Sequence, residues 1–141
     1  ELLASLETTT PEQLLQQWSD GRIKLLLTQR LLRFRREHEQ LFKRGSYLPL
    51  SVTGEFADCC VAFAREWEGK WIAVMVPRLS SRIGFPPIGE KWKDTAVELA
   101  AALTGENRVE LFTGRSQTGD ASLKLRDVFS VLPFAAVTNA R

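Results

Sequence analysis

The sequence predicts a mainly β domain in which one short and one long N-terminal helix pack with an antiparallel β-sandwich of about seven strands. Three observations support this fold class. Apolar residues recur at helical spacing from residue 22 up to Gly45. After Gly45 the apolar period becomes that of a strand, and turn residues follow at short intervals. A length of 141 residues, 44% hydrophobic and 26% charged, suits one globular domain with a substantial core.

Two helices are expected before the strands. Thr10 as N-cap, Pro11 at the first helical position and Gln13 in a capping box predict a short helix over residues 11 to 18. A longer helix begins at Arg22, and Gly45 is expected to end it in the left-handed conformation. The stripe that this helix should bury consists of Ile23, Leu27, Leu31, Phe34 and Phe42, widened by Leu26 and Leu41.

The strands follow without a visible repeat or low-complexity tract. They are expected near residues 47–53, 58–67, 70–77, 95–100, 108–112, 121–125 and 133–138. Their short length and mostly short connections favour an antiparallel sandwich. We therefore expect a helical segment over 1–45 and a sandwich over 46–141, together one compact domain.

The best-defined element is a hairpin around Glu68 and Gly69. A two-residue loop there would pair Trp67 with Lys70, Arg65 with Ile72, and Phe63 with Val74. This register places Val61, Phe63, Ile72, Val74 and Val76 on one face, and Cys60, Ala62, Ala64, Trp71, Ala73 and Met75 on the other. Both faces are apolar, so we expect a central hairpin with the second sheet on one side. The long helix is expected to cover most of the small-residue face, with a neighbouring domain as the alternative cover.

Charge and cysteine content narrow the function classes. The net charge of +2 does not indicate a nucleic-acid partner, although six basic residues crowd the end of the long helix. A solvated helix face is the favoured interpretation of that segment. These basic residues are Arg30, Arg33, Arg35, Arg36, Lys43 and Arg44. Cys59 and Cys60 are adjacent, a poor geometry for a bridge, and are expected to be small buried thiols.

Targeting signals and chain ends give further expectations. No apolar run of about 18 residues suggests a membrane span, and no leader pattern opens the chain, so cytoplasmic localisation is the default expectation. The chain starts at Glu1 without a methionine, and Met75 lies within an apolar run. This suggests an excised or processed piece.

No catalytic or metal centre is expected from the residue pattern, and no cofactor. Close carboxylate pairs occur, but none lies in a context that buries one member and solvates the other. The pairs are Glu37 with Glu39, Glu66 with Glu68, and Glu90 with Asp94. His38, the single histidine, extends the helix stripe and is interpreted as a boundary residue that packs its ring. Without further histidines, spaced cysteines or an acidic loop, a metal site is not expected.

The four tryptophans raise the question of sugar binding, because flat aromatic faces stack on glucose rings. Trp71 is expected in the core, and Trp18 is expected to join the two helices. Trp92 lies in a loop rich in Pro, Gly and Lys that runs into Asp94. Two interpretations stay open. Either Trp92 plugs the edge of the sandwich while Asp94 binds backbone amides, or this loop contacts substrate or the wall of a substrate cleft.

Ordered sequence blocks resemble a known family. The blocks are WSDGRIKLLLTQRLLRFRREHEQLFKRGSYLPL at 18–50, VAFAR at 61–65, VPRL at 76–79, PIGEKWKDT at 87–95, LFTG at 111–114 and LPFAAV at 132–137. Together they resemble the C-terminal segment, past the catalytic barrel, of maltooligosyltrehalose synthases in the α-amylase superfamily, glycoside hydrolase family 13. Two departures concern Cys59 and Cys60, where the family pattern has a His, and Ala100 to Ala102, which replace a Leu-Pro stop.

The resemblance implies chemistry performed elsewhere in a parent enzyme. Such synthases are glucosylmutases, classed as isomerases of trehalose biosynthesis, which convert the reducing-end α-1,4 bond of a maltooligosaccharide to α-1,1. Retention of configuration needs two carboxyl groups about 5–5.5 Å apart, and in this superfamily they sit on loops of a β/α barrel. This chain has no alternating strand and helix pattern that could build such a barrel.

The resemblance therefore implies a non-catalytic C-terminal accessory domain that is inactive alone. Its expected partners are the barrel of the same polypeptide and, through the parent, maltooligosaccharide, with no nucleic acid and no membrane. Trp92, Asp94 and Arg78 are the candidates for contact with substrate or barrel. One alternative is an independent carbohydrate-binding module. Another is an interaction or nucleic-acid module that uses the basic helix face.

Overall fold

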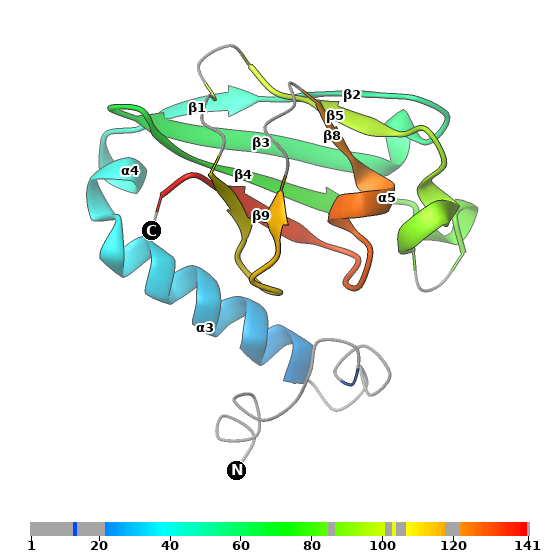
Figure 1. Ribbon diagram of the computed structural model, residues 1–141, viewed down its shortest axis with the longest axis horizontal. Coiled ribbons are helices and arrows are strands. Elements are labelled where there is room, and N and C mark those ends of the chain that lie inside the picture. Colours follow the sequence, from blue (N-terminus) through cyan, green and yellow to red (C-terminus); the bar gives the residue numbers. More distant parts are fainter. Residues whose placement is uncertain are drawn as a thin grey trace.

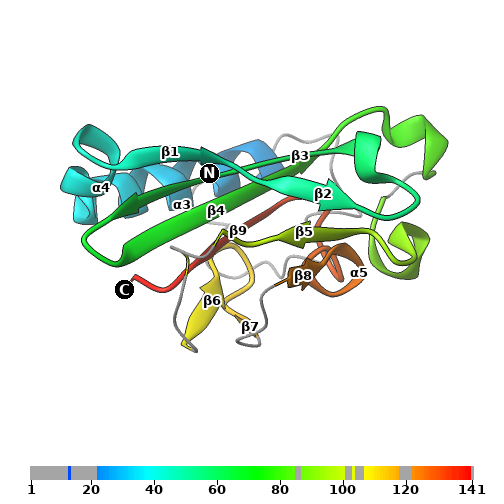
Figure 2. The ribbon, with the colours of Figure 1, turned by 90° about the horizontal axis from the view of Figure 1, so that it is seen from above.

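Two antiparallel sheets pack face to face, and two helices lie across the outer face of the larger sheet (Figures 1 and 2). The computed structural model describes residue 13 and residues 22–84, 87–100, 103, 107–117 and 122–140. The helices in these ranges are α3 (Arg22–Glu37), α4 (Glu39–Lys43) and the single-turn α5 (Leu125–Val128). The predicted fold class is confirmed. The predicted short helix over 11 to 18, with Trp18, lies outside the described residues.

The strands divide between a six-stranded and a three-stranded sheet. The large sheet has the order β1 (Ser46–Pro49), β3 (Cys60–Trp67), β4 (Lys70–Pro77), β9 (Ala135–Thr138), β6 (Arg108–Glu110) and β7 (Ser116–Gln117). The small sheet has the order β2 (Ser51–Thr53), β5 (Ala96–Glu98) and β8 (Ser122–Lys124). The connections contain the short 3-10 helices η2 (Ala57–Cys59), η3 (Ser80–Arg82) and η4 (Gly89–Trp92). Each of the seven predicted strands contains observed strand, and β7 was not predicted.

The strand predicted over 47–53 is in fact two strands that belong to different sheets. Pro49 ends β1, an edge strand of the large sheet, where a missing backbone N–H is tolerated. Leu50 is buried, and its N–H donates to the carbonyl of Ala62 at 3.0 Å. The chain then continues as β2 in the small sheet. One extended segment therefore joins the two layers of the sandwich.

The hairpin prediction is confirmed in its full register. Trp67 pairs with Lys70, Arg65 with Ile72, and Phe63 with Val74. Glu68 and Gly69 both have positive φ, 49° and 84°, as a two-residue turn matched to strand twist requires. The hairpin is also central, because β3 pairs with β1 on one side and β4 pairs with β9 on the other.

The predicted position of the long helix was wrong. The small-residue face of the hairpin packs on the small sheet, where Ala62 and Ala73 share a core with Val97 and Leu123. The helices lie on the opposite face, where Leu26 and Phe34 of α3 and Leu41 of α4 pack with Ile72 and Ala136. Interiors are close-packed, so the volume left by small side chains must be filled. The large rings in that core fill it: Trp71, Trp92 and Phe129.

The long helix also differs from the prediction at its end. It breaks at His38, whose φ of −126° and ψ of 49° are not helical, and α4 then adds a short second helix. Gly45 does not adopt the predicted left-handed conformation, since it is not among the positive-φ glycines. Its role is spatial. A Cβ at Gly45 would lie 2.0 Å from the carbonyl oxygen of Leu41 and 3.0 Å from that of Glu66.

Gly45→Ala is therefore expected to destabilise the fold by ~1–3 kcal/mol, because the added methyl group forces the backbone of α4 away from β3. Urea denaturation followed by circular dichroism measures this change. Ser46→Ala is the matched control, because Ser46 is the next residue and is exposed. Equal midpoints for the two variants would contradict the close approach at Gly45.

Candidate functional site

Trp92, the first sequence-predicted site residue, is fully buried in the sandwich core. Its indole N–H donates a 2.6 Å hydrogen bond to the carbonyl of Pro87. Its ring centroid lies 5.2 Å from that of Phe129, at a tilt of 59°. Both are members of the core between the two sheets. The ring is thus occupied by contacts within the domain, as the structural interpretation of this loop requires.

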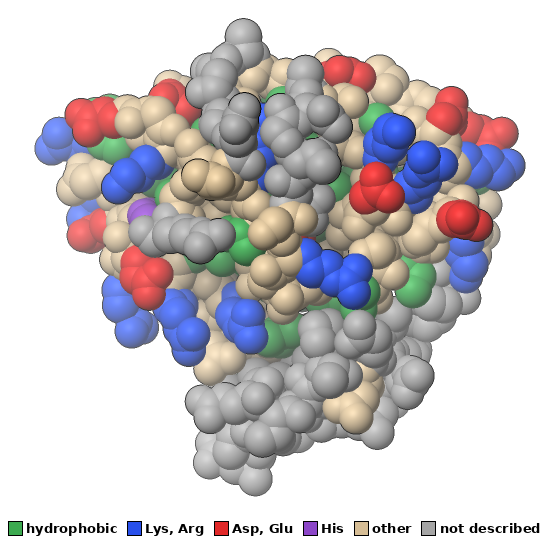
Figure 3. Space-filling model, viewed as in Figure 1, with side chains coloured by type: hydrophobic (Ala, Val, Ile, Leu, Met, Phe, Trp, Pro, Cys, Tyr) green, Lys and Arg blue, Asp and Glu red, His purple; other side chains and the backbone are tan. Residues whose placement is uncertain are grey.

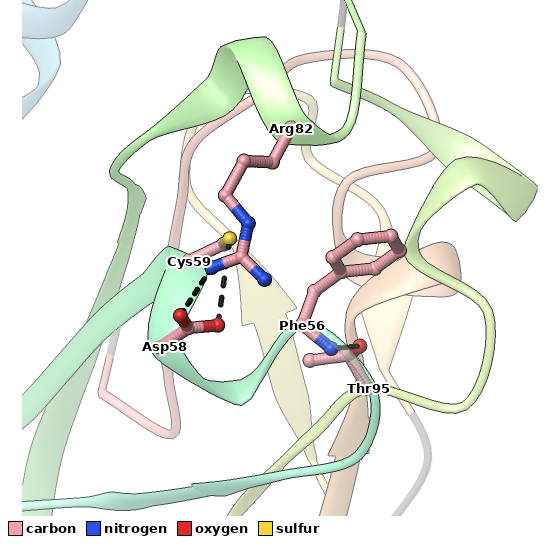
Figure 4. Close-up of polar contacts among 5 residues, drawn as sticks. All are labelled: Phe56, Asp58, Cys59, Arg82 and Thr95. Atoms are coloured by element: carbon pink, nitrogen blue, oxygen red, sulfur yellow. Dashed lines mark hydrogen bonds and ion pairs between the residues drawn. The ribbon is translucent and has the colours of Figure 1, made fainter.

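Asp94, the second predicted residue, ties its loop to the turn that follows β2. The Oδ1 atom of Asp94 accepts a 3.1 Å hydrogen bond from the backbone N–H of Glu55. The next residue repeats the arrangement, because Thr95 Oγ1 accepts from the N–H of Phe56 at 3.1 Å (Figure 4). Lys93 adds a 2.7 Å ion pair with Glu55. Asp94 and Thr95 therefore hold the two loops together, each through one backbone amide.

Arg78, the third predicted residue, is exposed just after β4. Its backbone N–H donates to the carbonyl of Cys59 at 2.7 Å. Nearby, Arg82 pairs with Asp58, which also accepts a hydrogen bond from the Cys59 thiol at 3.7 Å (Figure 4). The hydrogen bond from Arg82 lowers the pKa of Asp58. Arg78 and Asp94 are therefore tied to the same turn, residues 54–59, from two different segments.

The two cysteines are free and buried, as predicted. Burial raises the pKa of the Cys59 thiol, and it raises the pKa of Cys60 to about 12. The thiolate is the reactive form of cysteine, so both side chains are poor nucleophiles at neutral pH. Both side chains contribute packing to the core between the two sheets.

The predicted carboxylate pairs do not form an acid and base pair. Most of their members are exposed: Glu37, Glu39, Glu68, Glu90 and Asp94. Glu66 is half-buried and accepts a 3.0 Å hydrogen bond from the N–H of Gly69, which closes the hairpin turn. Glu39 pairs with Lys43 at 2.6 Å along α4. Glu66 and Glu39 thus make local contacts in a turn and on a helix surface, and the exposure of the other members agrees with the expectation of a solvated role.

A buried carboxylate that sequence reasoning missed is Glu110 on β6. Its Oε1 atom accepts from the backbone N–H groups of Phe112 and Ala136, both at 3.2 Å. Its Oε2 atom accepts from the N–H of Thr113 at 2.8 Å and from the Thr113 hydroxyl at 2.7 Å. Gly114 marks the turn that follows β6, but no local pattern marks the burial of Glu110. With four donors on two oxygens, Glu110 serves as a structural acceptor.

His38 lies at the break between α3 and α4, beside a cavity of about 410 Å³. Its ring packs 4.4 Å from that of Phe34, as the sequence interpretation expected. Its Nε2 atom is the one buried side-chain polar atom without a hydrogen-bond partner in the described part of the chain. The cavity lies between the helix break and the hairpin turn. Its lining is of mixed charge and includes Glu37, Trp67, Glu68 and Lys70.

The pH dependence of stability should report on His38. Burial, and then the charge of Lys70, lower its pKa from the ordinary 6.5. The unfolded chain therefore binds this proton more tightly, so the contribution to stability is complete above about pH 6.5 and is lost as pH falls toward the folded-state pKa. Since His38 is the only histidine, one imidazole resonance gives its pKa by NMR titration. A folded-state value at or above 6.5 contradicts this, and His38→Gln should flatten the stability profile between pH 7 and 5.5.

The basic segment of the helices is interrupted by acidic side chains (Figure 3). Arg30 is not free, because its guanidinium donates to the carbonyl of Leu111 at 3.1 Å. The exposed members are Arg33, Arg35, Arg36, Lys43 and Arg44. Among the residues that the structure describes, no three His, Cys, Asp or Glu side chains are grouped as metal ligands. No helix in those ranges is long and apolar enough to cross a membrane.

These contacts define a class of protein: a helix-backed antiparallel β-sandwich whose described polar side chains mainly secure turns and loops. The fold is similar to part of maltooligosyltrehalose synthase from Arthrobacter ramosus, with a TM-score of 0.62 and 26% identity over 83% of this chain. A mutant of that enzyme gives a TM-score of 0.61 and 24% identity over 90% of this chain.

The chain spans only a small part of the enzymes that it matches, 14% and 16% of their lengths. No protein-family model matches the sequence, and no curated protein matches it significantly. The resemblance to maltooligosyltrehalose synthases drawn from the sequence blocks is confirmed by the structural match, which fits a small C-terminal domain of that enzyme.

Proposed function

We propose that this chain is a non-catalytic accessory domain of a maltooligosyltrehalose synthase, which supports a catalytic barrel in the same polypeptide. The observation that carries the proposal is the asymmetry of the structural match, 83% of this chain against 14% of the enzyme chain. A domain of this size leaves most of such an enzyme elsewhere. In this proposal the parent forms α-1,1 bonds at the reducing end of maltooligosaccharides and works in the cytoplasm.

The side chains support the non-catalytic part of the proposal. Retaining transfer of a glucosyl group needs a nucleophilic carboxylate and a carboxylic acid about 5–5.5 Å apart in one cleft. The carboxylates of the predicted pairs lie mostly on the surface, and Glu110 has its oxygens occupied by four donors. Free buried thiols also suit a reducing compartment.

The test compares the 141-residue chain with the whole polypeptide encoded by its gene. The coding sequence before Glu1 should specify a β/α barrel with acidic catalytic residues. With maltoheptaose as substrate, the whole polypeptide should remove reducing ends and form trehalose termini, whereas the chain alone should form none. Activity of the chain alone would refute its non-catalytic role. An inactive whole polypeptide, or one without a barrel, would refute the proposed parent.

A carbohydrate-binding module is the second candidate, favoured by one observation. Trp67 is the described tryptophan that is not fully buried, and it lines the cavity beside His38 together with Glu68 and Lys70. A half-exposed aromatic ring next to polar groups suits a sugar ring. Calorimetric titration with maltoheptaose should then show binding that Trp67→Ala abolishes. Absence of heat exchange at millimolar sugar would remove this candidate.

A further inference from the structure

Of the helices that the structure describes, α3 and α4 cover only half of the outer face of the large sheet. Near the hairpin turn, Arg65 donates to the carbonyls of Phe42 and Gly45 at 3.2 and 3.3 Å, which fastens α4 to β3. Ile72 is buried under the helices in the same half. Toward the start of β3 and the end of β4, the outward side chains become exposed. Within the described residues, α3 and α4 therefore leave the second half of this face open.

The open half is apolar and continuous. Its outward side chains are Tyr47, Val61, Phe63 and Val76, named here the β-face patch. Val61 and Val76 are directly paired across β3 and β4, and they are 44% and 38% exposed. Tyr47 is 58% exposed, and its ring stacks on that of Phe63 with centroids 5.5 Å apart and an angle of 25°. Sheet register thus joins four exposed or half-exposed hydrophobic residues into one surface.

The outer face of the small sheet shows what a solvated face of this protein looks like. Its exposed residues are polar: Ser51 and Thr53 on β2, Glu98 on β5 and Lys124 on β8. Ser51 lies directly opposite Glu98, and Lys124 opposite Ala96. A sheet that faces water alternates apolar and polar residues in this way. At the β-face patch the outward positions carry apolar side chains instead of polar ones. A contiguous exposed apolar surface of this kind marks an interaction site.

We propose that the β-face patch is the docking surface for the catalytic barrel that precedes α3 in the same polypeptide. This inference rests on the proposed function. α3 lies on the same face of the large sheet as the patch, away from β5 and β8 (Figure 2). The first described turn of α3 therefore lies on the patch side of the sandwich, and the barrel of the proposed parent would precede it in the chain. The barrel then continues the interface that α3 and α4 begin, and it buries the four patch residues.

Tyr47 provides a direct probe, because it is the only tyrosine in the chain. Acetylation by N-acetylimidazole, mapped by peptide mass spectrometry, should modify Tyr47 readily in the 141-residue chain. In the whole polypeptide the rate should be about tenfold lower, as expected for a ring in the buried centre of an interface. Equal rates in the two proteins would overturn the proposal. Protection in the 141-residue chain itself, through a second copy or its own N-terminal residues, would overturn it as well.

A charge-neutral pair of substitutions tests the same surface by stability. V61E/V76K places opposite charges at two directly paired positions that already face water, so the Tm of the 141-residue chain should change little. In the whole polypeptide the same pair should lower the Tm and release the domain to limited proteolysis, because two charges would be buried at the interface. S51K, opposite Glu98 on the solvated face, is the matched control and should be silent in both proteins. An equal effect of V61E/V76K in both proteins would contradict docking.

Activity separates this inference from the proposed function. Protection of Tyr47 in a whole polypeptide that forms no trehalose termini would leave the docking surface standing and remove the proposed reaction. An active polypeptide in which Tyr47 remains readily acetylated would leave the proposed function standing and overturn the docking surface. A gene that encodes no domain before Glu1 would overturn the docking proposal outright.

Discussion

Glu110→Ala is expected to lower the free energy of unfolding by about 3–5 kcal/mol, the largest effect of a single polar substitution described here. The removed carboxylate accepts four hydrogen bonds, from Phe112, Ala136 and twice from Thr113. Without it, buried backbone N–H groups in the β6 turn and on β9 lose their acceptor. Such groups cost free energy when they are left unpaired away from water.

A graded series makes the origin of this loss measurable. Glu110→Gln keeps one oxygen, but its amide group would face either the Phe112 and Ala136 donors or the Thr113 donors, so an intermediate loss of ~2 kcal/mol is expected. Thr113→Val removes one hydroxyl donor and should cost ~1 kcal/mol. Glu98→Ala, on the exposed face of β5, is the control. Urea midpoints at constant m-value give each change, and an Ala variant as stable as the control would contradict the acceptor role.

Trp92→Ala is expected to destabilise the domain by about 3–5 kcal/mol, because it leaves a cavity between the sheets. The indole is fully buried, contacts Phe129 and donates to Pro87. Trp92→Phe retains most of the ring volume and loses the hydrogen bond, so a smaller loss of ~1–2 kcal/mol is expected. Thermal and urea unfolding of the 141-residue chain measure both values.

Kinetics of the whole polypeptide then decide between the two interpretations of the Trp92 loop. If the loop is structural, Trp92→Phe should leave kcat and KM for maltoheptaose unchanged at temperatures where the variant is folded. Asp94→Asn tests the exposed part of the loop in the same assay. A fall in kcat with normal stability in either variant would favour contact with substrate.

The hairpin was predictable because its information is local. Its two-residue turn and the period of its strands set the register of Trp67 with Lys70 and the positions that share a face. Which partner covers which face was not predictable. Both faces are apolar, and periodicity alone does not distinguish a helix from a second sheet as the covering layer. In the structure the small sheet covers the small-residue face. Large rings such as Trp71 fill the space that the small side chains leave in this core.

The candidate site shows the same division between local and distant information. That Asp94 accepts a hydrogen bond from a backbone amide follows from its place in a loop, although its partner Glu55 lies 39 residues away. Glu110 looked like one more polar residue at the end of a strand. Its burial depends on β9, whose Ala136 supplies a donor 26 residues further along the chain. A contact of that kind has no signature in the neighbouring sequence.

The position of β9 in the middle of the large sheet has a consequence for folding. β9 pairs with both β4 and β6, and Ala136 lies against the residues of α3 in the same core. The Thr138 hydroxyl donates to the carbonyl of Trp71, 67 residues earlier, and the Asn139 side-chain oxygen accepts from the N–H of Trp71, 68 residues earlier. Loops of that length close late in folding. Closing them costs chain entropy before the contacts that offset this cost have formed. During synthesis, α3 and the hairpin of β3 and β4 are therefore expected to wait for β9, so the large sheet is completed only after residues 135–138 have been made.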